Sequence, residues 1–276
     1  MKLYKLHNGV AIKSNKLFLL ENEDWDSFIN DDKLYDKLIS ITNSQKPVID
    51  NENILFDIDA PIKSQELWAA GVTYSKSKEE RQEESKDAGG GDFYARVYEA
   101  ERPELFFKGT RNRIVNPGNK VRIRKDSNWN VPEPELTLVI TSSGKIVGYT
   151  IGNDMSSRSI EGENPLYLPQ AKTYDGCAAL GPCIFVTKEP IPGNTIISLE
   201  IKRKNIPVFG GKVEINQMKR KFKELVSFLY RECTFPNGSM LMTGTGIVPT
   251  SDFTLQSGDE ILITIEPIGT LINTVE

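Results

Sequence analysis

Two glutamates separated by one proline stand at the start of an apolar run in the middle of the chain. Glu133 and Glu135 belong to the segment VPEPELTLVI, residues 131–140, whose composition is typical of a buried β-strand. Side chains two positions apart on a strand point to the same face, so we expect these carboxylates to lie side by side. Two like charges in this arrangement require a cation. The alternative is a solvated, proline-rich turn with two surface glutamates.

A third carboxylate ends the next predicted strand. The segment KIVGYTIGND, residues 145–154, follows a tight Ser-Ser-Gly turn and ends in Asp154, so adjacent strands would bring Asp154 close to Glu133 and Glu135. Three oxygen ligands without histidine or thiolate favour a hard cation. Mg²⁺ would keep coordination positions open for water or substrate, and Mn²⁺ or Ca²⁺ could replace it. Pro134 cannot donate to a sheet ladder, which predicts an edge or a bulge here.

A polar stretch follows Asp154, and Pro165 and Pro169 predict that it is a loop and not a helix. Loops of this kind carry functional side chains more often than packing. Arg158 could bind a carboxylate with its bidentate fork, and Lys172 beside a metal would have its ammonium form disfavoured, which would suit a base. The alternative for both residues is an ordinary surface cation.

Composition restricts the class of protein. The chain has 276 residues, of which 38% are hydrophobic, and a net charge of −4, so it can bury a core but carries no single-sign field for nucleic acid. No apolar stretch approaches the roughly 20 residues of a membrane span, so membrane insertion and secretion are not expected. Three cysteines without a C-x-x-C pair favour a reducing, cytoplasmic location. A single histidine, His7, argues against Ser-His-Asp and multi-histidine metal sites.

The elements that must position these residues are predicted to be mainly strands, in an α+β fold. Residues 1–61 are expected to form a small N-terminal domain with short strands and a helix over residues 25–41. Residues 62–276 are expected to form the metal-binding catalytic domain, with a buried strand over 67–72 and one clear helix over 217–230. Further strands are predicted at residues 120–124, 135–140, 145–151, 183–187, 195–203 and 260–266.

The segment 75–91 is charged at most positions and ends in three glycines, which predicts a solvated helix with a hinge. Segments with such hinges also serve as lids over active sites. If it is a lid, its side chains would decide substrate chain length and stereochemistry.

Several motifs together resemble the fumarylacetoacetate hydrolase family. The resemblance covers about residues 65–273 and implies a β-roll or distorted barrel preceded by a small N-terminal domain. It also implies a divalent metal held by Glu133, Glu135 and Asp154, and a homodimer or homotetramer. The motifs are RPELFFKGT at 102–110, VPEPEL at 131–136, GYTIGNDMSSR at 148–158, ENPLYLPQAKTYDG at 163–176, GP at 181–182 and TGTGIVP at 243–249.

Within the family, these segments are most similar to dehydratases of 2-keto-3-deoxy sugar acids such as 2-keto-3-deoxy-D-arabinonate. In those enzymes the glutamate of R-P-E and the lysine of Q-x-K are catalytic candidates, which correspond to Glu104 and Lys172 here. Family members also bind substrate through the polar loop and the G-T segment. The resemblance therefore implies that Arg158, Gln170 and Thr245 contact a small 2-oxo acid substrate.

The chain departs from the family hydrolases that cleave carbon–carbon bonds. Those enzymes commonly pair a histidine with a glutamate to activate water, and residues 72–110 contain no histidine. This disfavours hydrolysis and favours the dehydratase branch.

The resemblance leads to a mechanistic hypothesis. Mg²⁺ would chelate the C1 carboxylate and C2 carbonyl and stabilise the enolate formed by loss of a C3 proton, after which the C4 hydroxyl leaves. Lys172 is the preferred base and Glu104 the acid, although the roles could be exchanged; tautomerisation through C5 would give 2-oxoglutarate semialdehyde. The alternatives are a hydrolase, decarboxylase or isomerase of an acylpyruvate or diketo acid, and a non-catalytic 2-oxo-acid-binding protein.

Overall fold

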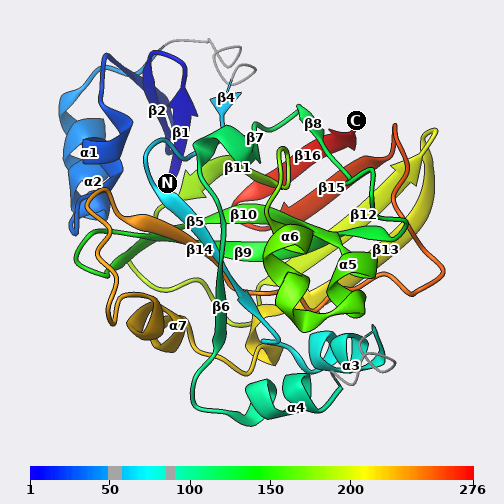
Figure 1. The fold of residues 1–276 in the computed structure, drawn as a ribbon. Coiled ribbons are helices and arrows are strands. Elements are labelled where there is room, and N and C mark those ends of the chain that lie inside the picture. The colour runs from blue at the N-terminus through cyan, green and yellow to red at the C-terminus, as the bar shows by residue number, and fades with distance from the viewer. Residues whose placement is uncertain (49–57, 85–90) are drawn as a thin grey trace.

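Two β-sheets packed against each other dominate the computed structural model, which describes residues 1–48, 58–84 and 91–276 (Figure 1). Among the described residues the larger sheet has 11 strands and the smaller has 5. Helices cover the outer face and ends of the larger sheet (Figure 1). The prediction of a mainly β, α+β fold is confirmed.

The larger sheet contains the predicted carboxylate-bearing strands at its centre. Its main path runs in the order β3 (Leu17–Glu21), β2 (Gly9–Lys13), β1 (Lys2–Leu6), β11 (Ala178–Phe185), β10 (Ile146–Ser157), β9 (Asn130–Ile140), β14 (Ser239–Met242), β5 (Glu66–Gly71) and β6 (Glu104–Gly109), while β4 (Ile58–Asp59) pairs with β1 and β7 (Ile114–Val115) with β11. The smaller sheet runs in the order β13 (Ile206–Glu214), β12 (Ile196–Arg203), β15 (Glu260–Ile265), β16 (Gly269–Val275) and β8 (Lys120–Val121).

Strand β9 is buried along its whole length because both of its faces are covered. On one face Leu136 and Leu138 pack in the apolar layer between the two sheets, together with Ile263 of β15. On the other face Val139 belongs to the core beneath the N-terminal helices. The carboxylates share this second face with Val139, since period-two geometry places residues 133, 135, 137 and 139 on one side.

Pro134 interrupts neither the strand nor its main ladder. The register between β9 and β10 is continuous from Gly148 to Ser157, and Pro134 stands opposite Asn153. Of the two predicted possibilities, an edge or a bulge, the bulge is therefore wrong and the edge fits the structure. On the opposite side the ladder with β14 covers only residues 137–140 of β9. Pro134 therefore lies beyond the end of that ladder, where its missing N–H costs no sheet hydrogen bond.

The N-terminal segment is joined to the larger sheet. Strand β1 pairs with β11, with Leu3 opposite Ile184. Helices α1 (Trp25–Ile29) and α2 (Leu34–Ser44) pack on the face of the larger sheet that contains Val139. The division at residue 61 stays a prediction. The prediction of a single helix over residues 25–41 is wrong, because the chain forms two helices with a break between them. In the break, the Asp32 carboxylate accepts hydrogen bonds from Thr141 and Ser143 in the β9–β10 turn.

The polar stretch after β10 is helical, contrary to the prediction of a loop. It forms α5 (Arg158–Glu163), the 3₁₀ turn η3 (Pro165–Tyr167) and α6 (Leu168–Lys172). Pro165 and Pro169 lie in the first turns of η3 and α6, where the missing N–H has no helical partner and the fixed φ favours a helix. Each proline therefore starts a short helix.

The remaining helices lie at the ends of the sheets. Helix α3 (Ser75–Glu84) and helix α4 (Gly91–Glu99) pack on each other near α5, whereas α7 (Phe222–Leu229) lies apart from them (Figure 1). The helix predicted over 217–230 is shorter than expected, because the 3₁₀ turn η4 (Ile215–Gln217) precedes it; a further 3₁₀ turn, η2 (Arg111–Arg113), follows β6. The predicted glycine hinge lies mostly outside the described residues. Within those residues no helix is both long and apolar enough to cross a membrane.

Candidate active site

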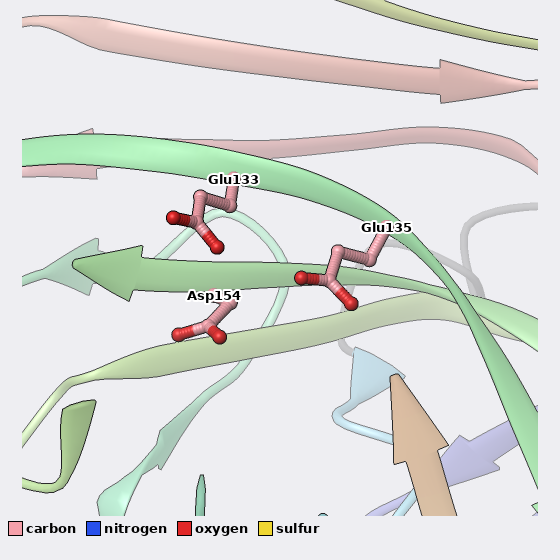
Figure 2. Close-up of side chains that lie close together, drawn as sticks. All are labelled: Glu133, Glu135 and Asp154. Atoms are coloured by element: carbon pink, nitrogen blue, oxygen red, sulfur yellow. The ribbon is translucent and has the colours of Figure 1, made fainter. Parts of the chain in front are cut away.

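The structure brings the three predicted carboxylates together on one face of the β9–β10 pair. Asp154 stands directly opposite Glu133, and Gly152 stands opposite Glu135. One carboxylate oxygen from each acidic residue lies within 4.8 Å of the others, and all three residues are buried (Figure 2). The alternative of two surface glutamates on a solvated turn is therefore wrong.

Cationic side chains surround the triad. Glu133 accepts hydrogen bonds from Arg158 Nη2 at 2.6 Å and from Lys172 Nζ at 2.8 Å. Asp154 lies between two lysines, with Lys108 Nζ 2.6 Å from Oδ1 and Lys172 Nζ 3.2 Å from Oδ2. Arg158, Lys108 and Lys172 are almost completely buried, so they are not surface cations.

The buried charges disfavour ionisation of the two glutamates. Burial, Asp154 and Glu161 raise the pKa of Glu133, although Lys172 acts in the opposite direction. Burial, Asp154 and Glu133 raise the pKa of Glu135 well above the usual range. Glu135 also accepts a hydrogen bond from the Gly244 main-chain N–H. The donor set consists of three buried carboxylates on one face and is all oxygen, which fits a hard divalent cation.

Lys172 is held as an ammonium in this arrangement. Burial lowers its pKa, but the carboxylates of Asp154, Glu133 and Glu161 outweigh burial and raise it above the usual value. Glu161 of α5 lies 3.4 Å from Lys172 Nζ. Although burial works against ionisation of Glu161, the cations Arg81, Lys172 and Arg158 lower its pKa to about 2.

Glu104 lies beside this cluster on β6, the end strand of the larger sheet's main path. It stands opposite Gly71 of β5, and a Cβ atom at position 71 would lie only 1.9 Å from Glu104 Oε2. Glycine at position 71 is therefore what lets the Glu104 side chain fold across the strand. Burial raises the pKa of Glu104 despite the opposing charges of Arg81 and Lys172. Its buried Oε2 has no hydrogen-bond partner in the described part of the chain.

A small cavity opens onto the cluster between α3 and the segment that follows β14. The open space measures only about 10 Å³, which is room for about one water molecule. Ser77 and Arg81 of α3 line one side and Thr245 lines another, with its hydroxyl hydrogen-bonded to the main chain of Ile247. Arg81 pairs with Glu161 at 2.7 Å, so α3 is not wholly solvated as predicted and closes over the cavity.

Gln170 is the one candidate that the structure does not bring to the cluster. Its side chain is exposed, and only its main-chain carbonyl has a described contact, from Arg124. Gln170 and Lys172 are two positions apart on α6, so a helix points them in different directions. The expectation that Gln170 contacts substrate came from the family resemblance, and it stays a prediction.

Three buried charged residues of the site were not singled out from the sequence. Lys108 was visible only as part of a motif, and Arg81 and Glu161 only as members of polar segments. Lys108 follows Glu104 at an even spacing on β6, and this shared face is the one signal that could have indicated it. Nothing in the sequence predicted that Arg81 and Glu161 would pair across two helices.

A mainly β fold that gathers a buried carboxylate triad, a lysine and a glutamate beside a small cavity is typical of enzymes that use a divalent metal. The chain belongs to the fumarylacetoacetate hydrolase family, since the family model described as fumarylacetoacetate (FAA) hydrolase C-terminal matches residues 66–276. The resemblance found in the motifs is thus confirmed.

Two curated relatives and one solved structure are informative. A probable 2-keto-3-deoxyxylonate dehydratase of Haloferax volcanii is 47% identical over 242 residues, covering 87% of this chain and 82% of the relative. The 2-dehydro-3-deoxy-D-arabinonate dehydratase of Saccharolobus solfataricus is 46% identical over 222 residues, covering 79% and 74%. A solved 2-keto-3-deoxy-D-arabinonate dehydratase complexed with magnesium and 2,5-dioxopentanoate matches with a TM-score of 0.83 at 37% identity, covering 100% of this chain and 99% of that one.

Proposed function

We propose that this protein is a Mg²⁺-dependent hydro-lyase that converts a 2-keto-3-deoxy sugar acid, such as 2-keto-3-deoxy-D-arabinonate, into 2-oxoglutarate semialdehyde. The observation that carries the proposal is the placement of Glu104 and Lys172 around the triad, in a chain 46% to 47% identical to dehydratases of such acids. The D forms of 2-keto-3-deoxyxylonate and 2-keto-3-deoxyarabinonate are one compound, because the keto group at C2 and the loss of the C3 hydroxyl remove the centres that distinguish the parent sugars. The relatives therefore point to a single substrate.

The metal would be held by Glu133, Glu135 and Asp154. Their buried oxygens and the raised pKa values of the two glutamates support this assignment. When bound, Mg²⁺ would supply positive charge that polarises the C2 carbonyl of the substrate and makes the C3 protons more acidic.

Lys172 is the proposed base for the C3 proton. Its Nζ contacts the carboxylates, and its side chain lines the cavity that would have to widen to admit substrate. Because those carboxylates hold the proton on Lys172 in the metal-free protein, the amine becomes available only when their charge is compensated. Arg158 keeps the neighbouring Glu133 carboxylate in place through its hydrogen bond.

Glu104 is the proposed acid for the departing C4 hydroxyl. Its raised pKa favours the protonated form, and its unpartnered Oε2 leaves one oxygen available for substrate. Lys172 takes a proton from C3, and the C4 hydroxyl leaves as water with the proton donated by Glu104. Transfer of a proton from C5 to C3 then gives the C4=C5 enol, whose hydroxyl proton moves to C4 to give the aldehyde.

The absence of a histidine near the site supports dehydration over hydrolysis. The chain has a single histidine, His7, which lies on the exposed turn between β1 and β2. A histidine–glutamate pair that activates water cannot form from this chain's own residues.

Product analysis by NMR tests the proposal. The chain is incubated with 2-keto-3-deoxy sugar acids and with acylpyruvates, each with Mg²⁺ and with EDTA. We expect Mg²⁺-dependent semialdehyde from the five-carbon acid, with the carbon count conserved. Carbon–carbon cleavage of an acylpyruvate or release of CO₂ would instead favour a hydrolase or decarboxylase, and binding without any product would favour a non-catalytic role.

Variants then test the residues. Glu104→Gln and Lys172→Ala are expected to bind Mg²⁺ and lose turnover, whereas Glu200→Gln, on β12 of the smaller sheet, is the matched control and should keep it. If both site variants fold, bind Mg²⁺ and retain full turnover, neither residue belongs in the mechanism.

We also propose that the protein works as a homodimer or homotetramer in the cytoplasm. Apolar side chains exposed on the smaller sheet support self-association, and the free cysteines Cys177, Cys183 and Cys233 suit a reducing compartment. The exposed apolar side chains are Ile196, Ile206, Val208 and Ile272. Light scattering after size-exclusion chromatography measures the number of chains in the assembly, and a monomer at micromolar concentration would contradict the proposed oligomer.

A further inference from the structure

Lys108 is a fully buried lysine whose ammonium contacts three oxygens of the active-site framework. Its Nζ donates to the main-chain carbonyl of Met155 at 2.9 Å and to the main-chain carbonyl of Lys172. It also forms an ion pair with Asp154 Oδ1 at 2.6 Å. Two of the three N–H groups of the ammonium thus hydrogen-bond to the main chain, and its charge faces Asp154 Oδ1.

The second buried lysine of the site is bound in a different way. Within the described ranges the Nζ of Lys172 hydrogen-bonds to side-chain oxygens, at 2.8 Å for Glu133, 3.2 Å for Asp154 and 2.5 Å for Ser156 Oγ, and it lies 3.4 Å from Glu161. Lys172 also lines the cavity. The two lysines therefore hold opposite oxygens of the same aspartate, one anchored to the main chain and one facing the space where substrate would sit.

The place of Lys172 at the end of α6 explains why its neighbour Lys108 is a cation with several N–H donors. Lys172 is the last residue of α6, and the last carbonyls of a helix have no partner within the helix. This carbonyl belongs to a fully buried residue, and without a donor it would be left without a hydrogen-bond partner, which is unfavourable in the protein interior. A positive charge also suits the negative end of the helix dipole. Lys108 thus ties strand β6 to the end of β10 and to the base-bearing end of α6.

We propose that Lys108 is a positioning residue of the metal site: it holds Asp154 Oδ1, so that Oδ2 is the oxygen offered to the divalent cation, and it fixes the main chain that carries Lys172. This inference rests on the proposed metal site. It does not depend on the identity of the substrate. Groups that orient metal ligands in this way commonly contribute 10–100-fold to metal affinity or activity.

If Lys108 acted only through its charge, its removal would change the metal affinity in the opposite direction. A buried ammonium beside the ligands repels a divalent cation, so removing it should tighten metal binding if Lys108 acted only through its charge. If Lys108 acts by orienting Asp154, removing it should weaken metal binding. The direction of the change in affinity therefore separates the two explanations.

The test is Mn²⁺ binding to the EDTA-stripped protein, followed by electron paramagnetic resonance and without substrate. Lys108→Met keeps the length of the side chain and removes its donors. Lys5→Met is the matched control, since Lys5 is a largely buried lysine paired with Asp59 at 2.8 Å, on β1 in the N-terminal segment. We expect a Kd for Mn²⁺ at least tenfold higher in Lys108→Met and unchanged in Lys5→Met, with circular dichroism showing both folded.

Each outcome decides something specific. An affinity of Lys108→Met within twofold of the parent chain, or tighter, overturns the positioning role. Failure of the parent chain itself to bind Mn²⁺ overturns the proposed metal site, and this inference falls with it.

If Lys108→Met does not fold, side-chain ¹⁵N NMR of Lys172→Met answers the same question. Lys108 is then the one fully buried lysine left within the described ranges, so its ammonium should give a slowly exchanging signal. We expect that signal to shift on addition of Mg²⁺, because Asp154 changes its partner. A signal that stays in place when the metal binds overturns the proposal.

Discussion

Replacing Gly71 by alanine should displace Glu104 and slow turnover while leaving the fold intact. The added Cβ would lie 1.9 Å from Glu104 Oε2 and 2.6 Å from its Cδ, whereas ordinary contacts begin at 3.4 Å. The carboxyl group must therefore move by about 1.5 Å. It is the end of a flexible side chain, so the movement should cost little stability. A shift of about 1 Å in a catalytic group can cost about 100-fold in rate, or about 2.7 kcal/mol of activation free energy.

Steady-state kinetics on three variants would check this reasoning. Gly71→Ala should lose about 100-fold in kcat/KM with Mn²⁺ affinity unchanged. Gly210→Ala is the matched control, since a Cβ there would have its nearest neighbour at 3.7 Å, and it should lose nothing. The double variant Gly71→Ala/Glu104→Gln should be no slower than Glu104→Gln alone. Turnover within twofold of the parent in Gly71→Ala, or a full additive loss in the double variant, would refute the reasoning.

Three further predictions follow from the structure. EDTA should stop turnover without unfolding the chain, and Mg²⁺ at 100 times its Kd should raise the unfolding free energy by about 2.7 kcal/mol, measurable by calorimetry; no rise would contradict a folded-state metal site. Arg81→Met removes the ion pair with Glu161 that holds α3 over the cavity, so KM should rise about tenfold with unchanged Mn²⁺ affinity, and a changed Mn²⁺ affinity with constant KM would contradict this. Hydrogen bonds from Lys63 and from Ser27 lower the pKa of Asp24 to about 2, so this stabilisation is complete above the unfolded pKa near 3.8 and is lost as pH falls toward 2. Urea unfolding from pH 5 to pH 2 should show a flatter pH dependence for Asp24→Asn, and identical slopes would contradict the assignment.

The carboxylate triad could be predicted because its geometry is local. Glu133 and Glu135 are related by the period of one strand, and Asp154 is brought opposite them by a short turn. Strand periodicity and turn signals together fix such a register. The same reasoning gave most of the strands, although not their ends, since β9 begins at Asn130 and not at residue 135.

The prolines after β10 misled the prediction because their effect depends on position in a helix. Pro165 and Pro169 would break a helix from its interior, but both occur in a first turn, where proline is favoured. Recognising two short helices would have separated Gln170 from Lys172 at once. Periodicity gives little help in elements of only five or six residues.

The buried cations could not be predicted because their partners are distant in sequence. Lys108 is 46 to 64 positions from Asp154, Met155 and Lys172, and the pair Arg81 and Glu161 joins two separate helices. A lysine or arginine in a motif is by default a surface residue. Only the packed structure shows that these charges are enclosed with the acids that they neutralise.

The ammonium groups beside Asp154 also affect how the protein is assembled. Because Lys108 and Lys172 already compensate much of the enclosed negative charge, the chain can complete its fold before any ion arrives. Many small metalloproteins lack such internal counterions and remain unstructured until they are loaded. We therefore expect the metal-free chain to be folded and to bind Mg²⁺ reversibly. A shortage of magnesium should then give an inactive but protease-resistant apoprotein that regains activity when Mg²⁺ is added.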